Sequence, residues 1–173
     1  MIDAVKKWAI AFGYVGVIYL TLPVMRGLLN WIRKISTAQA FSITTNLFMG
    51  FVFILLMFYL LRRHFPFSRI LIFLLVCSVF LIFIKNLKLP EERVHFLEYG
   101  LCGFLFMDAA ALKKWAGWRK VAIAVLLAVS AGVIDELLQG ILPSRVYDIR
   151  DIYFNSVAGI GGVVCRWWLF NQT

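Results

Sequence analysis

Ionisable side chains recur at helical spacing in the second half of this chain. His95, Glu98, Tyr99 and Cys102 are related by steps of three and four residues, so they lie on one face of a helix. An imidazole and a carboxylate can exchange protons when buried, and both can bind a divalent cation. His95 and Glu98 therefore predict an acid/base pair or metal ligands, and a hydrogen-bonded pair that only holds helices together is the structural alternative.

Two further polar stripes follow. Asp135, Glu136 and Gln139 fall within one turn at the end of an apolar run. The next stripe has steps of three, four, four and three residues: Asp148, Asp151, Asn155, Gly159 and Gly162. Carboxylates inside a membrane are costly and mark functional sites. We expect Glu136, Asp148 and Asp151 to join His95 and Glu98 in proton transfer or cation binding; the alternative is charge pairing with Arg145, Arg150 and Lys85.

Substrate contacts are predicted for Tyr99, Gln139, Arg145 and Asn155. The planar guanidinium of Arg145 can bind a phosphate, a pyrophosphate or a terminal carboxylate, or it can pair with Asp148. Gln139 and Asn155 can orient a substrate or join helices by hydrogen bonds. The glycines of the last stripe allow a neighbouring backbone to approach closely.

The elements that carry these residues are membrane-spanning helices. Hydrophobic residues make up 62% of the 173 residues, and the mean hydropathy is +0.87. We predict an all-α polytopic transmembrane helix bundle of about six spans, with an interfacial helix in residues 27–40. The spans lie near residues 8–25, 45–61, 69–87, 94–112, 119–142 and 151–170. The whole is one structural domain, with N-terminal helices in 1–90 and a core in 91–173.

The net charge of +9 is spread between apolar runs and forms no long basic block, which excludes nucleic acid as a partner. Ten Lys and Arg residues map to the side of the N-terminus and eight to the other side. This bias predicts that both termini are cytoplasmic. Seven of the nine acidic residues map to the opposite side, so the polar stripes should face outward.

A longer pattern joins these stripes. His95-x3-Tyr99, Glu136-x2-Gln139 and the run from Arg145 through Asp148, Asp151 and Asn155 to the two glycines together resemble the VanZ-like family of bacterial integral membrane proteins. The family is named for a protein associated with resistance to the glycopeptide teicoplanin. The resemblance implies a multi-pass protein of the bacterial cell membrane with a role in the envelope, and it implies no particular reaction.

These observations favour a polar pocket for an amphipathic, anionic ligand. Membrane lipids and polyprenyl-linked cell-wall intermediates are the expected ligands, and the protein is an enzyme that acts on them or a binder. A divalent cation is a conceivable cofactor. Two alternatives stay open: a structural subunit that assembles with other membrane subunits, and a small transporter with proton-coupled carboxylates. The chain has no nucleophile elbow, phosphate-binding Gly loop or HExxH motif.

Overall fold

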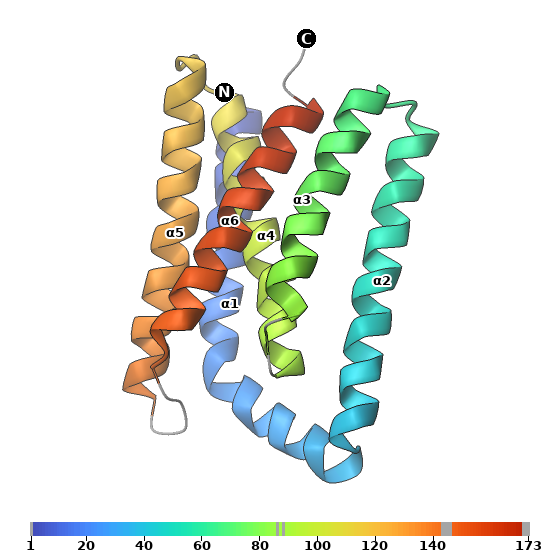
Figure 1. Ribbon diagram of the computed structural model, residues 1–173. Coiled ribbons are helices and arrows are strands. Elements are labelled where there is room, and N and C mark those ends of the chain that lie inside the picture. The colour runs from blue at the N-terminus through green and yellow to red at the C-terminus, as the bar shows by residue number, and fades with distance from the viewer. Residues whose placement is uncertain (1, 86, 88, 143–146, 171–173) are drawn as a thin grey trace.

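A computed structural model describes residues 2–85, 87, 89–142 and 147–170, which form six helices. In chain order they are α1 (Ile2–Ile35), α2 (Ala38–Arg62), α3 (Phe67–Lys85), α4 (Pro90–Ala111), α5 (Gly117–Ile141) and α6 (Ile149–Phe170). The predicted all-α bundle is confirmed. The start of α1 and the end of α6 lie at the same end of the bundle (Figure 1).

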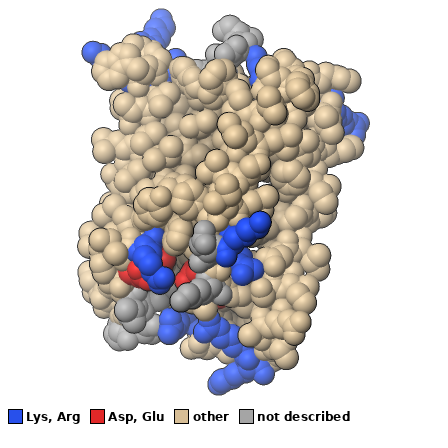
Figure 2. Space-filling view, viewed as in Figure 1, with Lys and Arg blue, Asp and Glu red and all other residues tan. Residues whose placement is uncertain are grey.

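Four helices, α1, α2, α3 and α5, are long and apolar enough to cross a membrane. The other two carry more charge and occupy the centre: α4 packs on every other helix, and α6 packs on α3, α4 and α5. At 22 residues each, α4 and α6 are about 33 Å long, which matches a hydrocarbon core of about 30 Å. Figure 2 shows a broad band without charge between Lys and Arg residues at the two ends. The chain is therefore a multi-pass membrane protein.

The segment predicted to be an interfacial helix is helical up to Ile35 and is continuous with the first spanning helix. Helix α1 reaches Ile35, and only Ser36 and Thr37 separate it from α2. Pro23 lies inside α1 and cannot donate a backbone hydrogen bond to the preceding turn, which favours a bend. In Figure 1 the last turns of α1 swing away from the bundle axis and cross its lower end to reach α2. Residues 27–35 are thus the bent end of a spanning helix.

Glycines allow α4 and α6 to pack backbone against backbone. A Cβ atom added to Gly103 would lie 1.9 Å from the carbonyl oxygen of Gly159, and one added to Gly162 would lie 1.8 Å from that of Gly100. No side chain fits at either place. The predicted close approach at Gly159 and Gly162 is confirmed, and its partners are the two α4 glycines. Small residues have this role at membrane helix interfaces because they maximise dispersion contacts between backbones.

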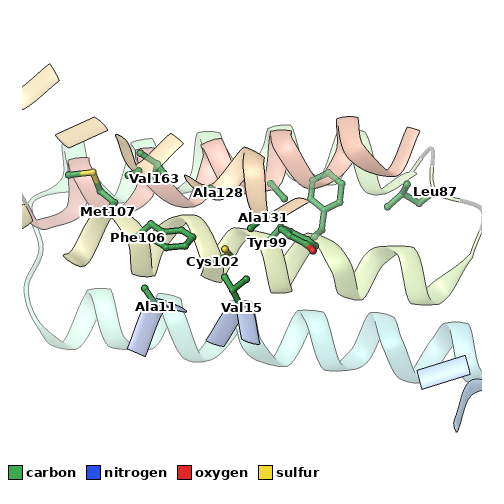
Figure 3. Close-up of a cluster of buried hydrophobic side chains, with 13 residues drawn as sticks. Ala11, Val15, Leu87, Tyr99, Cys102, Phe106, Met107, Ala128, Ala131 and Val163 are labelled. Atoms are coloured by element: carbon green, nitrogen blue, oxygen red, sulfur yellow. The ribbon is translucent and has the colours of Figure 1, made fainter. Parts of the chain in front are cut away.

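The main apolar core surrounds this crossing. Figure 3 shows Met107, Phe106, Cys102 and Tyr99 in a row along α4, with residues of α1, α5 and α6 on either side. Tyr99 lies at one end of this row, and among the side chains labelled in Figure 3 it alone carries a hydroxyl group. The core therefore passes into a polar region at the end of the bundle where α4 begins.

An ion network closes the opposite end. Asp108 of α4 accepts from Lys7 of α1 at 2.7 Å and from Nε of Arg166 of α6 at 2.5 Å. The carboxylate is partly buried, and two cations from different helices compensate its charge. This network ties three helices together far from the predicted site.

Candidate functional site

The three predicted polar stripes converge at one depth of the bundle. Glu98 lies eight residues after the start of α4, Asp135 six residues before the end of α5, and Asn155 six residues after the start of α6. At 1.5 Å per residue these positions are about 10 Å from the helix ends. The α4 and α6 starts and the α5 end share the lower end of the bundle in Figure 1. The helix topology thus brings together side chains that are up to 60 residues apart in the chain.

His95 and Glu98 form a close pair on α4. Nδ1 of His95 lies 2.9 Å from Oε2 of Glu98, and both side chains keep partial exposure. Beside them is a small cavity of about 140 Å³, which the bent part of α1 and the start of α4 line. Its volume holds a few water molecules or a small polar group. The pair is therefore accessible from a cavity, as an acid/base pair must be.

The α5 carboxylates are more deeply buried. Asp135 is 0% exposed and Glu136 is 1% exposed. Gln139 donates to Oδ2 of Asp135 at 2.7 Å, and the backbone N–H of Asp148 donates to Oε2 of Glu136 at 3.2 Å. Each carboxylate therefore has one oxygen satisfied by a defined donor. Gln139 acts within the site as a partner of Asp135.

Tyr99 and Asn155 complete the wall of the site. Both are buried, and both lie next to Gly132 of α5, where an added Cβ would come within 2.9 Å of Cβ of Asn155 and 3.7 Å of the Tyr99 ring. The absence of a side chain at Gly132 lets α4, α5 and α6 meet at this level. Asp151, one turn before Asn155, is half-buried and lies within electrostatic range of His95.

Oε1 of Glu136 is buried without a hydrogen-bond partner among the described residues, whereas the buried Tyr99 hydroxyl and the Asp135 carboxylate interact with each other. Most buried polar side-chain atoms in native proteins are paired, because an unpaired one keeps its full desolvation cost. The site therefore offers an acceptor oxygen of Glu136 to a polar group of a ligand. The deep carboxylates also interact electrostatically with His95, so the cluster acts as one charged unit.

Asp148 differs from the other predicted carboxylates. It precedes α6 and is held by Arg150, whose Nε and Nη2 atoms approach its oxygens to 2.9 Å and 2.5 Å. These charge-assisted bonds hold the pKa of the Asp148 carboxyl below its ordinary value. Its side chain pairs with Arg150, while its backbone N–H donates a hydrogen bond to Glu136. Arg145, the predicted anion ligand, lies outside the described residues.

Basic residues surround the acidic end of the bundle. In Figure 2 Lys and Arg side chains border the acidic patch at the lower end of the molecule on several sides. Arg33 of α1 pairs with Glu91 of α4 and thereby fastens the bent end of α1 over this region. The described residues contain no group of three His, Cys, Asp or Glu side chains placed to hold one metal ion.

Several contributors were not predicted from the sequence. Tyr14 and Tyr19 of α1 donate to the backbone carbonyls of Glu98 at 3.2 Å and Ala131 at 2.8 Å. Asp135, which belongs to the second polar stripe but was not among the predicted site residues, is the most buried carboxylate of the cluster. The sequence contained one indication of these bonds: the two tyrosines lie five residues apart in an apolar span, and a buried hydroxyl needs a hydrogen-bond partner.

The family comparison agrees with the part of the chain that forms this site. Residues 90–170, from the start of α4 to the end of α6, match the VanZ/LLP1 family. No curated protein and no solved structure matches the chain. The match contains all the described residues of the polar cluster. Residues 90–170 are therefore a VanZ/LLP1 family domain, carried by a multi-pass membrane protein.

Proposed function

We propose that this protein binds an anionic amphipathic lipid of the bacterial envelope, a phospholipid or a polyprenyl-linked cell-wall precursor, with the head group at the polar cluster. The observation that carries the proposal is the buried, unpaired Oε1 of Glu136 in the cluster with Tyr99 and Asp135. At this end of the bundle Figure 2 shows Lys and Arg side chains around an acidic patch. These cations suit a phosphate, and the carboxylate oxygens suit hydroxyl or ammonium donors. A head group that combines a phosphate with such donors fits both.

The chemistry available at the head group is proton transfer. His95 and Glu98 line a cavity, and the α5 carboxylates interact electrostatically with His95. The same groups support recognition alone, so turnover of the bound lipid is the measurement that separates an enzyme from a binder. Arg145, which the sequence predicts as an anion-binding residue, would add a further cation at the head group.

The site faces the outer side of the membrane in this proposal. The support is the excess of Lys and Arg on the side of the termini, which favours a cytoplasmic location for both ends of the chain. The polar cluster lies toward the opposite end, where envelope lipids and cell-wall precursors are exposed to the outside.

A purely structural role makes a different prediction. A carboxylate that only holds helices together is stable when both oxygens are paired, as at Asp108, where each oxygen has a cationic partner. Glu136 has a donor for Oε2 alone, and its Oε1 is buried without a partner among the described residues. This difference between two carboxylates of the same chain favours ligand binding at the acidic end.

Binding can be measured on the full chain in lipid nanodiscs. We expect the wild-type protein to retain phosphatidylglycerol over phosphatidylcholine with the same acyl chains, as read by native mass spectrometry after release from the disc. Asp135→Asn and Glu136→Gln should reduce this preference, since each changes a buried carboxylate of the cluster. Asp108→Asn is the matched control, with unfolding of each variant measured in parallel. An unchanged preference in both site variants, with the protein folded, would refute the proposal.

A further inference from the structure

The described part of the chain forms a large apolar groove that the polar cluster does not explain. It has a volume of about 1090 Å³ and lies between α2 on one side and α3, α4 and α6 on the other. Sites for drug-sized ligands measure about 300–1,000 Å³. Helix α2 packs on α4 and on α1 and stands apart from the rest of the bundle in Figure 1. The groove is therefore large enough for hydrocarbon chains and is a built feature of the fold.

The groove has two different ends. Asn46 and Glu98 line it at the acidic end of the bundle. At the other end Leu60, Phe73 and Leu169 belong to a small apolar core that joins α2, α3 and α6. Its lining on α2 extends from Asn46 to Leu60, about 21 Å at 1.5 Å per residue. This length exceeds half of a hydrocarbon core of about 30 Å. The groove is thus long enough to hold a lipid acyl chain that enters at the polar end over the depth of one leaflet.

A cation without a carboxylate partner lies at the polar end. Nη1 of Arg93 donates to Ser42 at 3.1 Å and to Asn46 at 2.8 Å, and its Nε is buried without a hydrogen-bond partner. In the described part of the chain Arg93 has no ion pair, whereas Arg33 and Arg150 nearby are both paired with carboxylates. A guanidinium in this state complements a phosphate.

Glu98 links the groove to the polar cluster. It lines the groove and also the small cavity beside His95. A lipid with its chains in the groove therefore has its head group next to Arg93 and within reach of the His95–Glu98 pair. Lipid chains alone gain little by leaving a bilayer for an apolar groove, because both are apolar. The preference of a lipid for the groove must therefore come from its head group. Arg93 provides the cation that binds this head group.

We infer that this groove holds the hydrocarbon chains of the lipid whose phosphate is bound at Arg93 and whose head group reaches the polar cluster through Glu98. The inference rests on the proposed function for the identity of the head group, but the groove can be tested separately. Gly50 makes the test possible: it lines the groove, and nothing lies within 4 Å of a Cβ added there. A large side chain at this position fills the groove without a clash at its Cβ.

The experiment uses the full chain in nanodiscs with trace phosphatidylglycerol or phosphatidylcholine that carries a photoreactive group on one acyl chain. After irradiation the labelled peptides are mapped by mass spectrometry. We expect labels from phosphatidylglycerol on the groove-lining parts of α2 and α3, and loss of these labels in Gly50→Trp. Gly13→Trp is the matched control, because Gly13 is also exposed and unobstructed but lies outside the groove. Arg93→Gln should weaken groove labelling by phosphatidylglycerol, and Arg93→Lys should keep part of it.

The outcomes separate the two proposals. Groove labels that persist in Gly50→Trp, or labels confined to other helix faces, would overturn the groove inference; a partner helix or second copy seated in the groove would give the latter result. Groove labels lost in Gly50→Trp, together with an unchanged lipid preference in Asp135→Asn, would keep the groove and refute the role of the polar cluster. A charge-assisted bond to Arg93 corresponds to roughly tenfold or more in occupancy, so groove labelling by phosphatidylglycerol that is unchanged in Arg93→Gln would refute the phosphate site.

Discussion

Replacing Gly162 by alanine should separate the two central helices of the bundle. The added Cβ would lie 1.8 Å from the carbonyl oxygen of Gly100 and 2.9 Å from the backbone nitrogen of Phe104. Both neighbours are backbone atoms of α4, so no side-chain rotation can relieve the clash. Ordinary contact begins at 3.4 Å, and the helices must therefore move apart locally by about 1.6 Å.

The expected cost follows from this displacement. Overpacking a well-packed core costs about 1–3 kcal/mol, and a clash between backbones belongs at the upper end of that range. Because alanine has a higher helix propensity than glycine, the substitution also stabilises the helix by at most about 1 kcal/mol. We expect Gly162→Ala to lower the free energy of unfolding by about 2 kcal/mol. The same displacement would disturb the site, because α4 carries His95 and α6 carries Asn155.

The assay is unfolding by sodium dodecyl sulfate in mixed micelles, followed by tryptophan fluorescence. Gly50→Ala is the control, since its Cβ meets nothing within 4 Å and should cause no loss of stability. A Gly162→Ala protein as stable as the wild type would show that the α4–α6 crossing is looser than the structure indicates, and the packing argument would be wrong.

Three further predictions use the same unfolding assay. Tyr19→Phe removes the hydroxyl donor to the α5 backbone and should lower stability by about 1 kcal/mol; an unchanged value would exclude that bond. Asp108→Asn leaves Arg166 without compensation and should cost about 2 kcal/mol, less than the 3–5 kcal/mol of a fully buried pair because both groups are partly exposed. Arg150 lowers the pKa of Asp148 in the folded state, so this carboxylate stabilises the fold above its ordinary pKa of 3.8 and ceases to do so as the pH falls below it. The stability difference between wild type and Asp148→Asn should therefore be present at neutral pH and vanish in acid, and a difference that grows in acid would contradict the sign.

Local patterns predicted the elements and the rough position of the site. Hydropathy identified the helices, since a spanning helix must be apolar over its length. Helical periodicity placed His95 and Glu98 on one face, and the structure places them 2.9 Å apart. The alternation of helix direction across the membrane put the acidic stripes at one end. Each of these inferences needs only neighbours in the chain.

Partners from distant helices could not be predicted in this way. In a membrane the lipid is as apolar as the protein interior, so an apolar sequence does not show which helix face is buried. Only the tertiary structure shows that α4 and α6 are central, that Tyr14 reaches the Glu98 carbonyl and that Arg93 turns toward α2. The same holds for Asp108, whose partners Lys7 and Arg166 come from two other helices.

The sequence by itself therefore determined that this is a helical membrane protein with its carboxylates gathered near one end, because hydropathy and periodicity are local properties. The tertiary structure decided which of those carboxylates are buried, which of their oxygens lack partners and where an apolar groove meets them. Those features depend on how closely helices approach one another, which glycines such as Gly103 and Gly162 set by contacts across the bundle.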